Sequence, residues 1–474
     1  MKILLIRPRM SEGDRASRGG PAWNASRYIL RKTSGIKLGE CNLTPPLALM
    51  TVAALTPPGF DVAIADDIVE EIDFDADVDL VGITTLTASV YRAYEIADQF
   101  MARGVKVVLG GVHATLLPDE AAGHADTVVV GQAEGVWPQV CIDAKNGSLN
   151  RFYRNPDYCD LRNMPLPRRD LLRERDYLSI NILQATRGCP NRCSFCSIHA
   201  VAGDTFRSRP VDDIISEIAT FSNPLTLFVD DNIIGDPAFA KKLFKALIPM
   251  RITWLGQATL EIAEDDELLD LAAKSGCKLL IFGFESLSQE GIRKIGKAQS
   301  NQVSDYGEVI NKVHARGIAV DGCFILGLDT DDNSVFERTV EFILENNIDI
   351  PHASILTPYP GTRLFKQLET EGRLIHKDWR HYWPAGKEPV YRPKLMTVNE
   401  LYEGQRFFWE SIYSLRPIAK RLISATRHTS LAGELFLAAV NLMQNRRLKT
   451  NLLVFKDPPD PDRTVDQTYE PISP

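Results

Sequence analysis

Residues 187–196 read Arg-Gly-Cys-Pro-Asn-Arg-Cys-Ser-Phe-Cys, and this stretch decides how the rest of the chain is interpreted. It follows directly after an apolar run at residues 180–186, which predicts a strand. Three cysteines, Cys189, Cys193 and Cys196, can converge on one iron–sulfur cluster because a loop lets their side chains point to a common centre. Three ligands leave one iron of a four-iron cluster open, which is typical of a catalytic rather than a structural metal site.

Structural zinc is the alternative for this loop, and it normally requires four closed ligands with paired Cys-x-x-Cys spacing. His199 is the nearest candidate for a fourth ligand. The other cysteines stand singly, which is typical of buried apolar thiols; they are Cys41, Cys141, Cys159, Cys277 and Cys323.

The whole-chain composition bounds the class of protein. A length of 474 residues predicts about three domains, and 44% apolar with 24% charged residues excludes a fibrous or wholly disordered chain. Eight cysteines are too few for a disulfide scaffold, and a net charge of -8 disfavours nucleic acid as a partner. No apolar run is long enough for a signal peptide or a membrane span, so we expect a cytoplasmic protein.

The N-terminal part alternates short β-branched runs with helical stretches. The runs predict strands at residues 2–6, 61–65, 80–84, 105–109 and 127–130. Continuous apolar strands separated by helices indicate a parallel sheet covered on both faces, so we expect a doubly wound, Rossmann-like α/β domain over residues 1–150. In such folds ligands bind at the carboxyl ends of the strands.

A second βα series follows a predicted linker at residues 151–179. Its strands are expected at residues 180–186, 225–230, 252–258, 278–284, 318–326 and 352–357. Six βα units over residues 180–385 fit a partial (β/α)6 barrel better than a full eightfold one. We expect a helical region at 386–456 and a disordered tail at 457–474, because the tail is rich in proline and poor in apolar residues.

The spacing Cys189-x-x-x-Cys193-x-Phe-Cys196 resembles the signature of radical S-adenosylmethionine (SAM) enzymes. The resemblance implies that these cysteines hold a [4Fe-4S] cluster, that SAM chelates the open iron, and that its cleavage gives a 5′-deoxyadenosyl radical. Segments 228–232, 283–286 and 324–328 resemble the strand ends that contact SAM, although an Asp-Asp-Asn turn is also an ordinary helix cap. The implied SAM contacts are Asp230, Asp231, Asn232, Glu285, Ser286, Ile325 and Gly327.

The first domain resembles the vitamin B12-binding domain of the radical SAM branch that includes hopanoid methylases. The resemblance lies in segments 110–115, 117–120 and 125–135, and loop 357–362 resembles the loop after the sixth barrel strand of this branch. The implied cobalamin contacts are Thr84, Thr85, Thr87, Gly110, Gly111, His113, Gly131, Glu134 and Gly135. The Asp-x-His-x-x-Gly motif that supplies a histidine to cobalt is absent, so no lower axial ligand is assigned.

These resemblances imply a cobalamin-dependent radical SAM methyltransferase that methylates an unactivated carbon of a hydrophobic substrate, such as a lipid, with a flavodoxin or ferredoxin as reductant. Porphyrin-like rings, peptides and antibiotic precursors remain open as substrates. The alternatives are a radical SAM enzyme for ring formation, ring contraction or carbon–carbon coupling, and a nonenzymatic metal- or cobalamin-binding regulator. Basic amphipathic segments at residues 401–448 predict either helices that close the barrel or a peripheral membrane contact.

Overall fold

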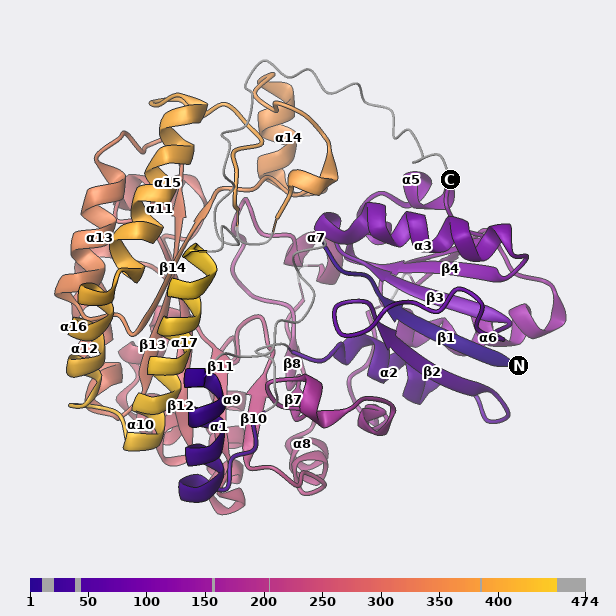
Figure 1. Cartoon of the computed structure of the whole chain (residues 1–474), viewed down its shortest axis with the longest axis horizontal. Helices are drawn as coiled ribbons and strands as arrows, with labels where there is room; N and C mark the ends of the chain where they lie inside the picture. Colours follow the sequence, from indigo (N-terminus) through magenta and orange to yellow (C-terminus); the bar gives the residue numbers. More distant parts are fainter. Residues whose placement is uncertain (11–20, 39–43, 156–157, 204, 384–385, 450–474) are drawn as a thin grey trace.

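The computed structural model describes residues 1–10, 21–38, 44–155, 158–203, 205–383 and 386–449. Two six-stranded sheets lie side by side, the N-terminal sheet on the right and the larger half on the left of Figure 1. The expected tail at residues 457–474 lies outside the described residues. No described helix is both long enough and apolar enough to cross a membrane.

The N-terminal sheet has the order β2-β1-β3-β4-β5-β6, and all of its strand pairs are parallel. Its strands are β1 (Lys2–Arg7), β2 (Asp61–Asp66), β3 (Leu80–Thr85), β4 (Lys106–Gly111), β5 (Thr127–Val130) and β6 (Phe152–Arg154). The predicted doubly wound domain is therefore confirmed. β6 was not predicted, because its three residues in a charged stretch give no strand pattern.

Helices cover both faces of this sheet, as the buried strands require. On one face α3 (Val90–Ala102) packs Val90, Tyr94 and Phe100 against the sheet. On the other face lie α2 (Leu47–Leu55) and α6 (Trp137–Asn146). Figure 1 shows α3 above and α2 below the sheet.

The second sheet has the order β14-β13-β12-β11-β10-β7, again entirely parallel. Its strands are β7 (Ile182–Leu183), β10 (Leu225–Phe228), β11 (Thr253–Gln257), β12 (Cys277–Glu285), β13 (Ala319–Leu326) and β14 (Ile350–Ile355). Because β7 and β14 are the two edges, the described strands form an open, partial barrel, as predicted.

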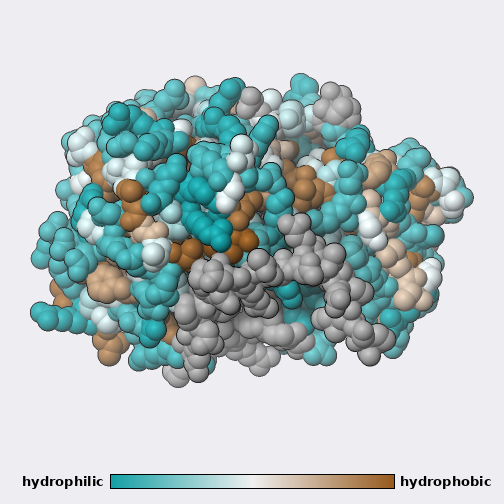
Figure 2. Space-filling view, turned by 90° about the horizontal axis from the view of Figure 1, so that it is seen from above, coloured by the Kyte–Doolittle hydropathy of each residue, from teal (hydrophilic) through white to brown (hydrophobic). Residues whose placement is uncertain are grey.

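The helices between the barrel strands pack against the outer side of the partial barrel. They include α8 (Val211–Ile218), α9 (Pro237–Leu247), α10 (Asp266–Lys274), α12 (Tyr306–Ala315) and α13 (Val335–Glu345). Outward-facing strand residues such as Trp254 and Phe282 are fully buried beneath these helices. Seen from above, the surface is mainly hydrophilic, with hydrophobic residues gathered toward its middle (Figure 2).

The first barrel strand is shorter than predicted. The chain leaves the sheet after Leu183, and β8 (Thr186–Arg187) pairs antiparallel with β9 (Arg207–Ser208). The reason is the buried carboxylate of Asp230, which accepts hydrogen bonds from the amides of Ala185, at 3.0 Å, and Thr186. These amides are therefore not free to extend the strand.

The C-terminal region is helical, as predicted, with α15 (Val398–Tyr413), α16 (Leu415–Ala425) and α17 (Leu431–Lys449). The N-terminal helix α1 (Pro21–Ser34) packs beside α17, although it was expected within the first domain. Its Trp23 and Leu30 are buried with Leu225 of β10 and Ala439 of α17. Residues 21–38 therefore belong spatially to the barrel half (Figure 1).

Candidate active site between the two sheets

The cysteine loop lies at the carboxyl end of the barrel strands, directly after β8. Neighbouring segments hold its backbone: the Ser194 amide donates to the Ile295 carbonyl at 2.8 Å, and the Leu364 amide donates to the Ser194 carbonyl at 2.9 Å. Gly188 has a φ of +89°, and a Cβ there would lie 2.1 Å from the Thr205 carbonyl oxygen. Only glycine fits at this entrance to the loop.

The three loop thiols are partly buried and free. Burial raises the pKa of Cys189, and it raises the pKa of Cys193 to about 12 and that of Cys196 to about 11. A bound cationic metal cluster would supply the positive charge that stabilises thiolates at such a place.

The spacing of the thiols argues against zinc. A single zinc ion would bring three donor atoms close together, but among the described residues the only such group within 4.8 Å is His314, Asp349 and His428. His199 Nε2 hydrogen-bonds the Asn191 carbonyl. The wider cysteine triad fits a multi-iron cluster.

The acidic strand end after β10 organises the start of the cysteine loop. Asp230 is buried and also accepts from the Thr186 hydroxyl at 2.6 Å, while Asp231 accepts from the Gly188 amide at 3.1 Å. Asn232 caps its own turn and accepts from the Thr259 amide at 3.4 Å. Asp230 and Asn232 are thus engaged inside the protein. The negative charge of Asp231 adds to burial in raising the pKa of Cys189 and that of Cys196.

We expect Asp230 to give the stability a measurable pH dependence. Burial raises the pKa of its carboxyl to about 6. Because a raised carboxyl pKa means that the folded state binds the proton more tightly than the unfolded state, stability should fall as the pH rises from about 4 to about 6. Thermal midpoints of Asp230→Asn should lack this slope, with Asp236→Asn, an exposed helix cap, as the control. Parallel slopes in wild type and Asp230→Asn would contradict the assignment.

Glu285 ends β12 in a strained conformation. Its φ of +64° is rare for a residue other than glycine, and the β12–β13 register shifts there. The carboxylate lies 2.5 Å from the Lys297 ammonium. Burial lowers the pKa of Lys297, but Glu285 outweighs burial and raises it above its ordinary value. Ser286 accepts from the Ser288 amide at 3.0 Å.

At the carboxyl end of β13, Gly327 is surrounded by other parts of the protein. Gly327 donates to Asp331 at 3.1 Å and accepts from the Tyr391 hydroxyl. A Cβ on Gly327 would lie 2.4 Å from that hydroxyl oxygen, so this glycine permits close packing with the protein itself. Ile325 is buried beside it.

Side chains cover only part of the inner wall of the barrel near the carboxyl ends of its strands, the region called the upper barrel below. Strand residues that face outward are buried, yet Val229 is 36% exposed and Gln257, Cys323 and His352 remain accessible. His352 keeps 30% of its side chain exposed, and its Nε2 lies 3.4 Å from the Asp321 carboxylate. The lumen thus exposes one apolar side chain, Val229, beside polar groups and the His352–Asp321 acid–base pair.

The predicted cobalamin residues separate into two groups. Thr84, Gly110, Gly111, Gly131 and Glu134 are partly exposed at the strand ends, and Gly135 is exposed. Thr85, Thr87 and His113 are buried. The Thr85 hydroxyl donates to the Gly110 carbonyl at 2.8 Å.

His113 is held from both sides. Its Nδ1 lies 3.2 Å from the Thr87 hydroxyl and its Nε2 lies 3.2 Å from Glu120. Trp379 donates to the same Glu120 at 3.1 Å, so this group ties the segment before α15 to the first domain. Sequence reasoning missed this contact because a single tryptophan carries no pattern.

Two further residues at the crevice were also missed. Leu86, directly after β3, is 48% exposed. The hydroxyl of Tyr359, in loop 357–362, is buried without a hydrogen-bond partner among the described residues. Such an orphaned polar atom calls for a ligand or water, and an exposed leucine at a strand end suits an apolar ligand surface. Burial and exposure are the signals here, and neither can be read from sequence.

The carboxyl-end loops of the two sheets face each other. The Arg187 guanidinium, at the start of the cysteine loop, lies 2.7 Å from the Glu134 carboxylate at the end of β5. A Cβ on Gly361 would lie 2.7 Å from Leu116 and 3.5 Å from Ala200 of the short helix α7 (Ile198–Ala202). The cysteine loop and the glycine-rich strand ends therefore share one crevice.

We expect Gly111→Ala to disrupt the first-domain side of this crevice. Gly111 has a φ of +96°, and its Cβ would lie 2.7 Å from the Thr85 amide nitrogen. Such strain costs about 1–3 kcal/mol, so the thermal midpoint should fall. Gly110→Ala is the matched control, because its Cβ would lie 3.6 Å from Val129, an ordinary contact. Equal behaviour of the two variants would contradict this account.

Comparisons with known proteins agree with this geometry. A family model described as the radical SAM superfamily matches residues 183–343, and a model described as the B12 binding domain matches residues 42–140. The chain is 32% identical to bacteriochlorophyllide d C-12(1)-methyltransferase of Chlorobaculum tepidum over 397 residues, which cover 80% of this chain and 84% of the relative.

Two further proteins are similar over most of the chain. Hopanoid C-2 methylase of Rhodopseudomonas palustris is 26% identical over 71% of this chain and 66% of its own length. The structure of the radical S-adenosylmethionine methyltransferase TsrM from Kitasatospora setae, with cobalamin and [4Fe-4S] cluster bound, aligns with a TM-score of 0.61. Its sequence identity is 14%, and the alignment covers 95% of this chain and 99% of that chain. This likeness supports the fold.

The fold and the site together define a radical SAM enzyme with an N-terminal B12-binding domain. The identity and coverage of the bacteriochlorophyllide methyltransferase relative assign the chain to a narrower family within this class. The chain belongs to the cobalamin-dependent radical SAM methyltransferase family, and its cofactors are a [4Fe-4S] cluster, SAM and cobalamin.

Proposed function

We propose that this enzyme methylates an unactivated carbon of a hydrophobic substrate that enters the upper barrel. The observation that carries the proposal is the accessible inner wall, where Val229, directly after β10, is 36% exposed, while Leu86, directly after β3 of the other sheet, is 48% exposed. The relative that is named as a hopanoid methylase supports an apolar substrate. Methyl transfer is favoured over ring formation or coupling, because the bacteriochlorophyllide and hopanoid relatives carry methyl-transferring names at 32% and 26% identity, whereas relatives named as magnesium-protoporphyrin IX monomethyl ester cyclases are 24% identical.

We assign the metal site to Cys189, Cys193 and Cys196. When bound, the cluster and SAM supply a radical that removes a hydrogen atom, and cobalamin supplies the methyl group. Asp230 holds the amides at the start of the loop, and the Glu285–Lys297 pair fixes the end of β12 beside it. We propose Asp231, Glu285 and Ser286 as the residues nearest SAM, with Asp230, Asn232, Ile325 and Gly327 as positioning residues.

The cobalamin side is assigned in the same way. Thr84, Gly110, Gly111, Gly131 and Gly135 lie accessible at the strand ends, so we propose that they line the ring or its side chains. Leu86 and Tyr359 complete this surface. We infer that Thr85, Thr87 and His113 position it from beneath, and that Glu134 orients Arg187 across the crevice.

Anaerobic purification, reconstitution with iron and sulfide, and addition of hydroxocobalamin test the proposal. We expect about four irons per chain and corrin absorption bands. Methyl-labelled SAM with a candidate apolar substrate should then give a product heavier by one CH2 unit. A product without added mass, formed together with 5′-deoxyadenosine, would make the ring-forming or coupling alternative the better one.

We also propose a reductant, a cellular location, a domain boundary and a membrane-facing surface for this protein. A flavodoxin or ferredoxin would supply the electron, and the free thiols of the described chain favour a reducing, cytoplasmic location. We place the functional boundary between the halves in residues 151–179, with residues 21–38 assigned to the barrel half because of their packing on α17. Peripheral membrane contact would use the exposed face of α16, where Ile423 is 66% exposed.

A further inference from the structure

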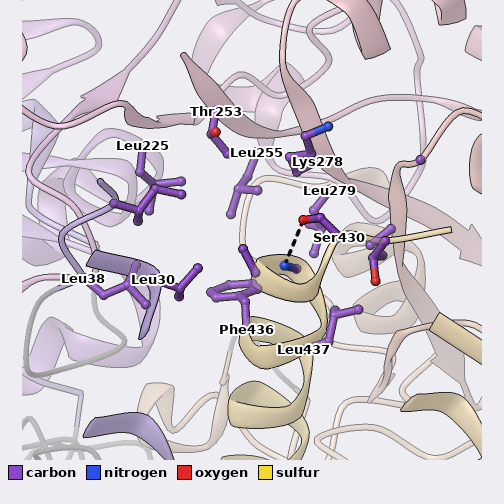
Figure 3. Close-up of a pocket in the computed structure, with 16 residues that line it drawn as sticks. Leu30, Leu38, Leu225, Thr253, Leu255, Lys278, Leu279, Ser430, Phe436 and Leu437 are labelled. Carbon is purple, nitrogen blue, oxygen red and sulfur yellow. Dashed lines mark hydrogen bonds between the residues drawn. The ribbon is translucent and has the colours of Figure 1, made fainter. Parts of the chain in front are cut away.

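A cavity of about 200 Å³ lies at the opposite end of the barrel from the cysteine loop. It is enclosed by α1, α17 and the amino ends of β10 to β13 (Figure 3). Its wall is formed mainly by aliphatic side chains and one aromatic ring: Leu30, Leu225, Leu255, Leu279, Phe436 and Leu437. The nearby ends of the barrel strands therefore surround an unfilled apolar space rather than a packed layer.

The wall of this cavity is deeply buried. Leu30 is 3%, Leu225 4% and Leu437 1% exposed. An apolar cavity of about 150 Å³ stays dry and binds benzene, so the present cavity has room for an alkyl chain of about six to eight carbons. Burying such a chain is favourable because it removes apolar surface from water.

The mouth of the cavity is polar and cationic. Thr253, Lys278 and Ser430 belong to its lining, and Lys278 is exposed. Figure 3 shows the Lys278 ammonium turned away from the leucines. It makes no ion pair within the part of the chain that the structure describes. A lysine stem that lines an apolar wall while its charge stays in water is the arrangement that suits an amphiphile.

The surface next to the mouth has the same mixed character. The turn that joins α16 to α17 supplies Ser430 to the cavity, and the adjoining Leu431 is 64% exposed. Arg416 and Lys420 are exposed on α16, and Arg427 is exposed two residues after its end. Exposed apolar side chains among cationic ones favour amphiphiles with a negatively charged head group.

We propose that this cavity binds the alkyl end of a single-chain anionic amphiphile, a fatty-acid-type carboxylate, whose head group rests at Lys278. The site lies at the amino ends of the strands, whereas the cysteine loop lies at their carboxyl ends. The proposal therefore does not rest on the proposed methyl transfer, and each can fail without the other.

Titration of the reconstituted holoenzyme with sodium octanoate, followed by calorimetry, tests the site. We expect saturable binding of one octanoate per chain and a higher thermal midpoint, since a ligand that binds only the folded state stabilises it. Octyltrimethylammonium, with the same chain and the opposite charge, should bind more weakly. Absence of saturable octanoate binding, or equal affinity for the two probes, would overturn the proposal.

Two variants separate the chain from the head group. Ala319 lines the cavity, so Ala319→Leu fills it and should abolish octanoate binding. Lys278→Gln keeps the cavity and should weaken octanoate binding about two- to fivefold, the range of an exposed ion pair, while 1-octanol binding stays unchanged. Lys242→Gln, an exposed lysine on α9, is the matched control.

The outcomes decide between the cavity and the neighbouring surface. Unchanged octanoate affinity in Ala319→Leu would overturn the cavity assignment, and Lys278→Gln keeps the test valid if Ala319→Leu does not fold. Attachment to phosphatidylglycerol vesicles without saturable octanoate binding would point to the α16 face as a membrane surface instead, and it would overturn the cavity proposal.

Discussion

Replacing Cys193 with alanine is expected to abolish reductive cleavage of SAM. The three loop thiols form the only donor set that the described strand ends offer to a multi-iron cluster at this position, and two thiols leave the cluster with a second open iron. Formation of 5′-deoxyadenosine should fall by about a thousandfold or more, since the variant removes the cofactor rather than one contact. Cys189→Ala and Cys196→Ala should behave in the same way.

The controls for this experiment are cobalt content and a second cysteine. Cobalamin binding should persist in all three variants, because the glycine-rich strand ends belong to the other sheet. Cys159→Ala is the matched control, since Cys159 is also free and partly buried but lies outside the loop. Full cleavage activity in Cys193→Ala would sink the assignment of the metal site.

Replacing Asp349 with alanine is expected to give the largest loss of stability. Asp349 is 2% exposed and precedes β14. Its carboxylate lies 3.0 Å from His314 Nε2 and 3.1 Å from His428 Nε2, and it accepts from the Val320 amide at 2.9 Å. Removing a buried charge with several partners costs about 3 kcal/mol or more.

The charge of Asp349 is present at neutral pH. Burial raises its pKa, but the hydrogen bonds from His314 and His428 outweigh burial and hold the pKa below its ordinary value. A lowered carboxyl pKa means that the stabilisation is complete above the unfolded value and is lost only in acid.

The thermal midpoint of Asp349→Ala at pH 7 should therefore fall by several degrees. Asp98→Ala is the control, because Asp98 pairs with His124 at 3.0 Å but is 39% exposed and should cost about 1 kcal/mol or less. Equal midpoints for the two variants would contradict the account.

The strands and the cysteine loop could be predicted from the sequence because each has a local sequence pattern. Strands buried on both faces are continuous apolar runs, and the strands of the first sheet match their predicted ranges within about two residues. The cysteine spacing is a local signal of the same kind. β6 was missed because three residues without an apolar run give no such pattern.

Long-range packing could not be predicted in this way. The amphipathic pattern of α1 shows that one face is buried but not that its partner is α17. Trp379 gives no hint that it reaches Glu120. Asp230 stays a predicted SAM contact, and no sequence pattern indicated that its oxygens also accept from the backbone amides of Ala185 and Thr186. A buried carboxylate takes such nearby amide donors.

The pairing of α1 with α17 also constrains the order in which the chain folds. The strands of the first sheet can assemble once residue 154 has left the ribosome, yet Trp23 and Leu30 lack their partner α17 until the chain has been synthesised to Lys449. Until then these side chains lack their burial partner, and the amino end of the barrel is covered only when both α1 and α17 are present. A fragment that stops near residue 150 would carry α1 without its partner, so it should aggregate more readily than a fragment from which residues 21–38 are also deleted.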